Sequence, residues 1–170
     1  MQISLTRGGA DDDTIVENMF TMFFYELSRY DDKMEITRFG LPVYMPQGAP
    51  PQTHGECVRV NWWVRGGGER YVIRADGVPA GFLIILNGLS VLPAGITIEL
   101  ADFWIVPKYR GRGVGRDAAR LAFDLHHGSW VVYQLPRNEP AKRFWHRVID
   151  EYTGGHFAML EDGAQQRFTT

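Results

Sequence analysis

The sequence predicts an α+β fold in which a mixed, mostly antiparallel β-sheet is flanked by helices. Three features indicate this class: an N-terminal segment with helical spacing, two β-rich segments joined by a hairpin turn, and a later strand–loop–helix–strand unit. Two strands connected through a helix run parallel, so this unit adds one parallel pair to the sheet. The 170 residues contain no repeat and no change of composition, and we expect a single domain over residues 1–170.

The N-terminal half is predicted to contain one long helix and one long loop. Apolar residues recur at helical spacing over Ile15–Tyr30, and Thr14 or Asp13 would serve as the N-cap. Repeated proline and glycine over residues 31–55 exclude a long helix or a central strand. Residues 60–64, VNWWV, have the composition of an aromatic strand that fills a core or lines a pocket.

The C-terminal half supplies most of the expected sheet. Segments 69–75 and 78–86 are β-rich, and the Asp76–Gly77 pair between them indicates a hairpin turn. Residues 96–106 form a nearly continuous apolar run, which is typical of a central strand covered on both faces. Further elements are expected as a helix over 115–127, a strand over 130–134, a helix over 139–150, and weak strands near 152–160 and 165–169.

Composition limits the functions to consider. The chain is 45% hydrophobic and 22% charged, as in ordinary globular proteins, and its net charge of −2 gives no general attraction to nucleic acid or acidic membranes. It has neither a secretory signal nor an apolar segment long enough to span a bilayer. The single cysteine, Cys57, excludes an internal disulfide and favours a reducing compartment. We therefore expect a cytoplasmic protein without nucleic-acid or membrane partners.

The central strand leads into a loop in which three glycines alternate with basic residues. Glycine lets backbone N–H groups face a ligand, and the helix that follows adds the positive end of its dipole. Arginine side chains suit phosphate oxygens. The alternative is a glycine-lined turn with a solvated basic rim. The predicted phosphate site consists of Arg110, Gly111, Arg112, Gly113, Val114, Gly115 and Arg116.

Two common phosphate loops fit this segment poorly. A P-loop needs Lys and then Ser or Thr after its last glycine, but Arg116 and Asp117 follow Gly115. The segment GVGRDA matches the dinucleotide pattern, which would make the protein an oxidoreductase. However, a hairpin precedes the unit, and the next strand ends in Gln134 rather than in an acidic residue.

Two motifs occur in a set order: RGRGVG at Arg110–Gly115, directly after the central strand, and NEPAKRFWHRVI at Asn138–Ile149, after the next strand. They resemble the Arg/Gln-x-x-Gly-x-Gly loop and the Asn-x-x-Ala-x-x-aromatic helix of the GNAT superfamily of acetyl-CoA-dependent N-acetyltransferases. With the hairpin GVPAGFLII, the resemblance covers about Tyr71 to Tyr152 and is closest to a bacterial subgroup of predicted acetyltransferases. It implies a GNAT-like sheet whose fourth and fifth strands are parallel and splayed.

The resemblance also implies how acetyl-CoA would bind. The backbone groups of Trp104, Ile105 and Val106 would bond the pantetheine amides as an added strand does, and the glycine loop would hold the pyrophosphate. Asn138 would bond the pantetheine arm. Trp145 would pack against the pantetheine or the acyl group, with plain core packing as the alternative. The thioester would lie between the splayed strands.

Two acidic residues on the central strand are candidates for the general base. Glu99 lies eleven residues before Arg110, which matches the base of the histone-acetylating branch of the superfamily. Asp102 lies deeper in the strand, where a carboxylate is costly to bury unless it is paired or useful. An exposed strand end and a buried ion pair are the alternatives. Glu99 and Asp102 have opposite parity, so they share one face only if a bulge intervenes.

The proton donor for the departing thiolate is the point where the sequence departs from the family. Trp145 stands where many members have Tyr, and an indole N–H is not a useful acid. Tyr133, Tyr152 or His146 could replace it. Water could also suffice, because a thiol has a pKa of about 8.5.

Metal and thiol chemistry are not expected. His54–Cys57, HGEC, contains the His-x-Glu of zinc deaminases, but that signature also needs two further cysteines. A Cys57 nucleophile paired with His54 lacks a third group to orient it.

The sequence therefore predicts an acetyl-CoA-dependent N-acetyltransferase in which an amine attacks the thioester directly. The acceptor would be a small-molecule or peptide amine, and a homodimer is allowed. Asp31, Asp32 and Glu35 either attract a cationic amine or form a solvated face. The alternative function is a non-catalytic module that binds or senses acyl-CoA.

Overall fold

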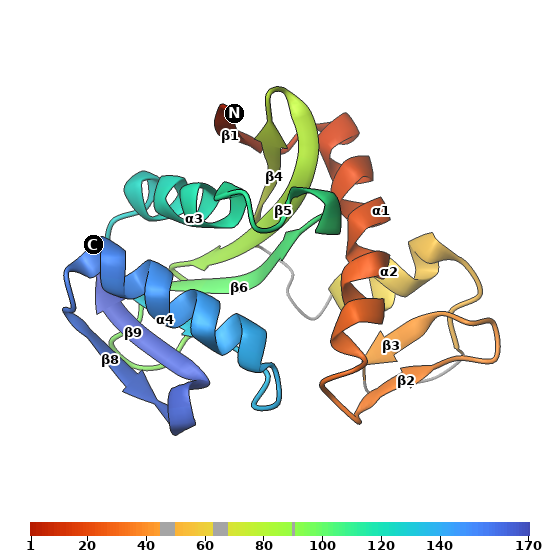
Figure 1. The fold of residues 1–170 in the computed structure, drawn as a ribbon. Helices are drawn as coiled ribbons and strands as arrows, with labels where there is room; N and C mark the ends of the chain where they lie inside the picture. The colour runs from red at the N-terminus through yellow and green to blue at the C-terminus, as the bar shows by residue number, and fades with distance from the viewer. Residues whose placement is uncertain (45–49, 63–67, 90) are drawn as a thin grey trace.

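The computed structural model describes residues 1–44, 50–62, 68–89 and 91–170. Within these ranges seven strands form one mixed sheet (Figure 1). In order across the sheet, they are β1 (Ile3–Arg7), β4 (Glu69–Ala75), β5 (Val78–Asn87), β6 (Ile98–Ile105), β7 (Ser129–Tyr133), β9 (Gln165–Thr169) and β8 (Phe157–Leu160).

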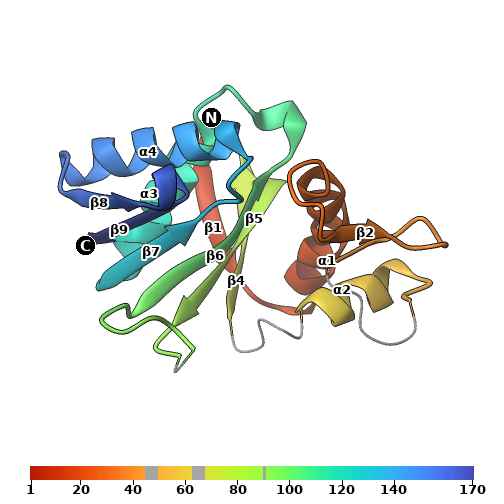
Figure 2. The same ribbon diagram turned by 90° about the horizontal axis from the view of Figure 1, so that it is seen from below.

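Helices cover both faces of this sheet. Helices α1 (Ala10–Leu27) and α2 (His54–Trp62) lie on one face, and α3 (Val114–Leu125) and α4 (Glu139–Thr153) lie on the other (Figure 2). Strands β6 and β7 are parallel, and the other neighbouring strands are antiparallel. The predicted α+β class with one parallel pair is confirmed for the described residues.

Alternation along β5 builds two separate cores. Phe82 and Ile84 join the cluster on the α1 side, whereas Leu83 and Ile85 join the cluster on the α3 and α4 side. Successive side chains of a strand point to opposite faces of the sheet. A continuous apolar run such as β5 is therefore buried on both faces. Alanine residues on the inner face of α3, such as Ala118 and Ala122, allow that helix to approach the sheet closely.

The predicted hairpin is present between β4 and β5. Asp76 has φ +50° and Gly77 has φ +80°, as a two-residue turn with both central residues left-handed requires. Ala75 and Val78 pair on either side of it.

The bounds of three predicted helices are corrected. Helix α3 runs from Val114 to Leu125 rather than over 115–127. Helix α1 begins at Ala10 rather than Ile15, with Gly9 as N-cap, because Asp11–Asp13 suit the positive end of the helix dipole in its first turn. It ends at Leu27 rather than Tyr30. Helix α4 continues to Thr153, where Gly154 terminates it with φ +61°.

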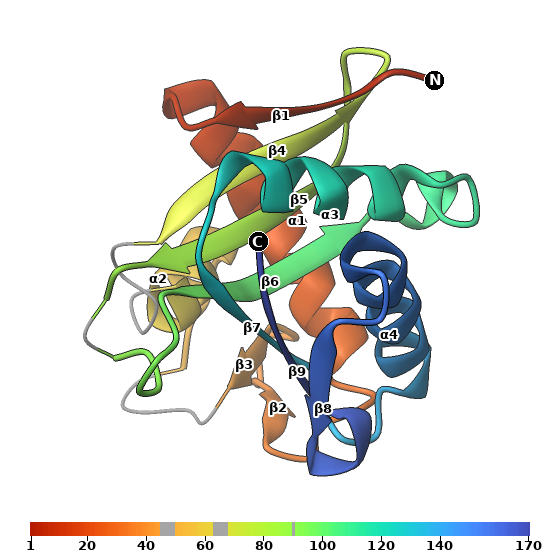
Figure 3. The same cartoon turned by 90° about the vertical axis from the view of Figure 1, so that its left-hand side faces the viewer.

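Four elements were missed by the sequence analysis. Strand β1 pairs antiparallel with β4 and forms one edge of the sheet (Figure 3). A small hairpin of β2 (Met34–Ile36) and β3 (Pro42–Tyr44) lies inside the predicted loop. Residues 60–62 of the predicted aromatic strand belong instead to α2, and residues 63 and 64 lie outside the described ranges.

The start of α2 carries a signal that explains the correction. Thr53 and Glu56 form a capping box, in which Glu56 N–H donates to Thr53 Oγ1 at 3.2 Å and Glu56 Oε2 accepts from Thr53 N–H at 3.3 Å. This reciprocal pair outweighs the strand preference of the aromatic residues that follow.

No helix in the described part of the chain is long and apolar enough to cross a membrane.

Gly81 brings β5 into close contact with β6. A Cβ at this position would lie 2.2 Å from the carbonyl oxygen of Trp104. We expect Gly81→Ala to lower the free energy of unfolding by about 3 kcal/mol, because a backbone atom must move to admit the methyl group. Val78→Ala, on the same strand but 52% exposed, is the control and should change it by less than about 0.5 kcal/mol. Urea denaturation checks both, and a wild-type midpoint for Gly81→Ala would contradict the contact.

Candidate functional site

The parallel strands β6 and β7 pair only over a short stretch. Residues Ile98–Leu100 align with Trp130–Val132, and no later pair follows in the described residues. The register between β5 and β6 shifts at the same level, because Ile84 pairs with Asp102 whereas Ile85 pairs with Leu100. Ala101 is therefore the extra residue of a β-bulge, and β6 bends away from β7 where this bulge begins.

The bulge places the two candidate bases on one face of the sheet. Asp102 is opposite Ile84, which belongs to the core on the α1 side. Glu99 alternates with Leu100, which belongs to the other core, so Glu99 also points toward α1 and α2. Asp102 is 5% exposed and Glu99 is half-buried. The condition for a shared face, a bulge between the two residues, is met.

Beyond the bulge, β6 presents backbone groups to the opening. Val106 N–H donates to the carbonyl of Ala80 at 2.9 Å, so this N–H belongs to the sheet. Alternate residues of a strand direct their backbone groups to the same edge, so those of Trp104 also point toward β5. The N–H and C=O of Phe103 and Ile105 then point to the opposite edge, toward the space left by β7. The Ile105 carbonyl accepts there from Arg110 Nε at 2.8 Å.

The glycine loop connects β6 to α3. After the short 3₁₀ helix η2 (Pro107–Tyr109), Gly111 and Gly113 adopt φ +71° and +83°, and Gly113 is the N-cap of α3. Gly115 serves a different purpose, because a Cβ there would lie 3.2 Å from the ring of Phe144 on α4. The side chain of Val114 is buried in the core, so only its backbone faces the loop.

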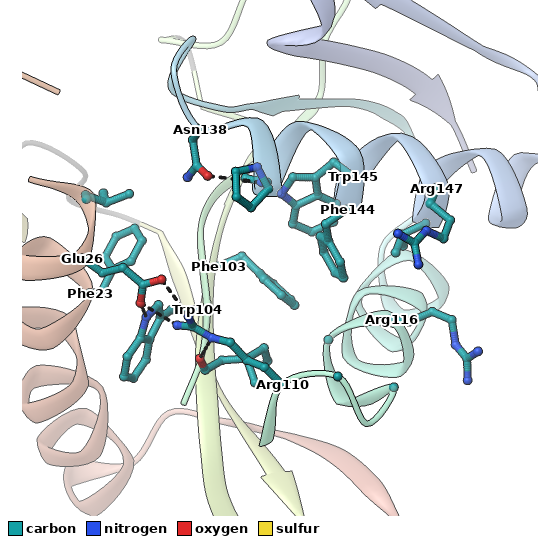
Figure 4. Close-up of a pocket in the computed structure, with 18 of the residues that line it drawn as sticks. Phe23, Glu26, Phe103, Trp104, Arg110, Arg116, Asn138, Phe144, Trp145 and Arg147 are labelled. Atoms are coloured by element: carbon teal, nitrogen blue, oxygen red, sulfur yellow. Dashed lines mark hydrogen bonds and ion pairs between the residues drawn. The ribbon is translucent and has the colours of Figure 1, made fainter. Parts of the chain in front are cut away.

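The opening beside β6 is a pocket of about 530 Å³. It joins the glycine loop, the free edge of β6 and the first turns of α4, and α1 forms its further wall (Figure 4). The predicted ligand-binding residues that line it are Trp104, Ile105, Arg110, Gly111, Gly113, Gly115, Arg116, Asn138 and Trp145. Val106, Arg112 and Val114 are not among the lining residues, and neither are Glu99 and Asp102.

Three aromatic rings form the inner wall of the pocket. Phe103 meets Trp145 edge-on with ring centroids 5.0 Å apart and stacks on Phe144 at 5.9 Å. Trp145 is 5% exposed and also belongs to the core beneath α4. Core packing of Trp145 is thus present, whereas its contact with the pantetheine or the acyl group stays a prediction.

Helix α1 contributes a carboxylate that the sequence analysis did not single out. Glu26 accepts hydrogen bonds from Arg110 Nη1 at 2.7 Å, from Arg110 Nη2 at 2.5 Å and from the indole Nε1 of Trp104 at 2.8 Å. Burial raises the pKa of Glu26, but hydrogen bonds from Arg110 and Trp104 and the charges of Arg110 and Arg29 outweigh it and hold the pKa below its usual value.

The remaining positive charges lie at the other end of the pocket. Arg116 at the start of α3 and Arg147 from α4 are on the same side (Figure 4). Arg116 forms an ion pair with Asp117 at 2.9 Å. In the described part of the chain, neither Arg112 nor Arg147 forms an ion pair. Arg147 and the loop amides are thus placed for an anion, whereas the charges of Arg110 and Arg116 are already balanced by Glu26 and Asp117.

Asn138 lies at the mouth of the pocket as the N-cap of α4. Its Oδ1 accepts a hydrogen bond from Ala141 N–H at 3.2 Å. The side-chain N–H₂ group is not used in this cap, which leaves Asn138 a donor toward the pocket.

The candidate proton donors lie elsewhere. Tyr152 donates to Asp124 at 2.8 Å, and burial together with that carboxylate raises its pKa to about 12. His146 is exposed and its ring packs on Phe157, with centroids 5.5 Å apart. Neither residue lines the pocket, and Tyr133 does not either. Among the described residues, the tyrosine that does line it is Tyr30, just after α1.

Two of the three acidic residues after α1 form structural contacts. Asp31 Oδ1 accepts from Lys33 N–H at 2.9 Å, and Asp32 pairs with Arg137 at 2.7 Å. Glu35 is exposed on β2. None of the three lines the pocket. The structure thus shows turn and ion-pair contacts for Asp31 and Asp32.

No group of three or more residues in the described ranges is arranged to hold a metal ion. Cys57 is buried and its thiol donates to the carbonyl of Pro42 at 2.9 Å. His54 is exposed at the start of α2, and neither residue lines the pocket.

Comparisons with known proteins agree with this geometry. The family model of the acetyltransferase (GNAT) family matches residues 36–149, so the chain belongs to this family. No curated protein sequence matches the chain.

Solved structures share the fold at low identity. An acetyltransferase from Thermus thermophilus has a TM-score of 0.60 and 18% identity, covering 100% of this chain and 98% of that one. A spermidine N-acetyltransferase from Vibrio cholerae, in complex with CoA and spermine, has a TM-score of 0.58 and 12% identity, covering 99% of this chain and 95% of that one. A GNAT-family acetyltransferase from Streptococcus agalactiae has a TM-score of 0.58 and 11% identity, covering 99% of this chain and 95% of that one.

The ion pair of Glu26 predicts a pH dependence of stability. Because its pKa is lowered in the folded state, ionised Glu26 stabilises the fold at pH values above its ordinary pKa of 4.5. This contribution is lost as the pH falls through 4.5 and then through the lower folded pKa. We expect Glu26→Gln to lose less stability than the wild type between about pH 6 and pH 3, measured by urea denaturation. Parallel pH profiles would contradict the pairing.

Proposed function

We propose that the chain, as one domain of 170 residues, is an acetyl-CoA-dependent N-acetyltransferase that acts on a primary amine. One observation carries this proposal: the glycine loop at the start of α3 and the free backbone edge of β6 line the same pocket. A phosphate-bearing ligand with an amide-containing arm needs both features, joined end to end. A cytoplasmic location, favoured by the single cysteine, is part of the proposal.

The pyrophosphate would bind to the amides of Gly111–Arg116. Gly111 and Gly113 supply the backbone turn, and the α3 dipole favours negative charge there. Arg147 would supply compensating charge from α4. Arg116 would do so by exchanging its ion pair with Asp117 for one with the phosphates, and Arg112 would act from outside the pocket lining. The pantetheine amides would pair with the backbone of Phe103 and the N–H of Ile105, since the Ile105 carbonyl accepts from Arg110 Nε. This stretch begins one residue earlier than the Trp104–Val106 stretch predicted from the sequence.

Acetyl-CoA supplies an activated thioester carbonyl when bound. The chain must then accept a proton, because an amine resembling that of lysine has a pKa of about 10.4 and attacks only when neutral. In the proposed step, the amine nitrogen bonds to the carbonyl carbon and the carbon–sulfur bond breaks. The amine proton passes to Glu99 or Asp102, and the thiolate leaves without a covalent intermediate on the protein.

The shared face of Glu99 and Asp102 supports this assignment. The α1 and α2 side of β6 is then the side from which the amine approaches. Since neither carboxylate lines the pocket, a water molecule would relay the proton from the amine. Water would also protonate the thiolate, since Tyr152 and His146 lie outside the pocket.

The same observation favours a second candidate function. A module that binds or senses acyl-CoA needs the glycine loop and the β6 edge but no base within reach of the thioester. Such a module suits two features: Glu99 and Asp102 lie outside the pocket lining, and Trp145, whose indole is no useful acid, stands in place of the family's tyrosine. Turnover separates the two functions, because only the enzyme releases CoA thiol in the presence of an amine.

Loop substitution tests the phosphate site. We expect Gly113→Glu to weaken acetyl-CoA binding at least about 100-fold, since it places a carboxylate beside the pyrophosphate. Gly95→Glu is the matched control, because Gly95 also has a positive φ of +78° but does not line the pocket. Calorimetric titration measures both affinities. Equal affinities for Gly113→Glu and Gly95→Glu would contradict the site.

Carboxylate substitution tests the base. We expect Glu99→Gln or Asp102→Asn to reduce turnover about 10²- to 10⁴-fold with little change in acetyl-CoA affinity. Thiol release over a panel of primary amines that includes polyamines measures turnover, and Asp11→Asn on exposed α1 surface is the control. Full turnover in both variants would show that neither Glu99 nor Asp102 is the general base. Acetyl-CoA binding without turnover in the wild type would favour the sensing module.

A further inference from the structure

Helix α1 reaches the pocket through one polar group. The carboxylate of Glu26 lies between the end of β6 and the start of the glycine loop and is held by three hydrogen bonds from Trp104 and Arg110 (Figure 4). Glu26 and Arg110 are 84 residues apart in sequence. All three side chains line the pocket.

Arg110 links this carboxylate to the backbone of β6. Its Nε donates to the carbonyl of Ile105 at 2.8 Å, while its two terminal nitrogens form a bidentate pair with Glu26. A guanidinium held on three sides has little freedom to rotate. The indole of Trp104 lies beneath it, 5.8 Å from the guanidinium carbon to the ring centroid.

We propose that Glu26 is a positioning residue for acetyl-CoA binding that acts through Arg110. The choice of acetyl-CoA as the ligand rests on the proposed function. The hydrogen bonds among Glu26, Arg110 and Trp104 are independent of it. By orienting Arg110, Glu26 keeps the Ile105 carbonyl engaged and leaves the Phe103 backbone and the Ile105 N–H for the pantetheine. It also fixes the α1 wall of the pocket to the loop that binds the pyrophosphate.

Whether removal of the Glu26 carboxylate weakens or tightens acetyl-CoA binding distinguishes this positioning role from a purely electrostatic one. A carboxylate near a pyrophosphate repels it and neutralises a nearby arginine, so removal of the charge alone would tighten binding. If Glu26 positions Arg110, removal loosens the guanidinium and the Ile105 carbonyl, and binding weakens. Charge-assisted bidentate pairs of this kind restrict geometry strongly, which favours the second outcome.

A double-mutant cycle tests the proposal by calorimetric titration of acetyl-CoA. We expect Glu26→Gln and Arg110→Gln each to weaken binding about tenfold. The double variant should be no weaker than the weaker of the two single variants, because both act through one contact. Glu17→Gln, an exposed carboxylate on the same helix, is the matched control and should bind as the wild type does. In ¹⁵N spectra, the Trp104 indole N–H signal should shift in Glu26→Gln and not in Glu17→Gln.

Several outcomes would overturn the proposal. Unchanged or tighter binding by Glu26→Gln excludes positioning, and additive effects in the double variant show that Glu26 does not act through Arg110. If Glu26→Gln does not fold, Glu26→Asp carries the test, since it keeps the charge but withdraws the carboxylate by one methylene; wild-type affinity in this variant also excludes positioning. A wild type that does not bind acetyl-CoA overturns both this proposal and the proposed function, whereas normal binding by wild type and variants alike overturns only the role of Glu26.

Discussion

The parallel pairing of β6 and β7 stops after Leu100, and the position of the candidate site follows from that stop. A strand in the middle of a sheet normally satisfies its backbone groups on both sides. Here the bulge at Ala101 turns β6 away from its neighbour, and Phe103, Phe144 and Trp145 fill the inner side of the gap with aromatic rings. The edge of β6 therefore remains open to a ligand while the sheet around it stays closed, and the glycine loop begins where that edge ends.

The second constraint is the connection of α1 to this open strand. Apolar packing in the two cores and pairing with β5 hold the C-terminal end of β6, and Glu26 adds a polar contact to it. The pairing of Glu26 with Arg110 and Trp104 supplies a contact from the opposite face of the sheet. It also changes the electrostatics of the loop, because one of its arginines is balanced before any ligand binds. Of the other two arginines that line the pocket, Arg116 is paired with Asp117, whereas Arg147 reaches the pocket from α4 without an ion pair among the described residues.

Local signals explain what could be predicted from the sequence. The Asp76–Gly77 turn, the glycine loop and the apolar run of β6 are each specified within a few residues, and each is present. Elements that depend on distant partners were missed: β1 is defined by its pairing with β4, and Glu26 meets an arginine 84 residues away. From the sequence, a bulge could be named as the condition for Glu99 and Asp102 to share one face. It could not be located, because its position depends on the register between β5 and β6. The capping box at Thr53 was a local signal for α2 that strand propensity hid.

The central claim is that the loop and the open edge of β6 form one site for acetyl-CoA. Backbone amide NMR during titration with acetyl-CoA tests it directly, because it reports both parts at once. The account predicts concerted shifts at Gly111, Gly113, Phe103 and Ile105, with Val106, whose N–H is bonded to Ala80, much less affected. Shifts confined to the loop, or located on another face of the sheet, would contradict it.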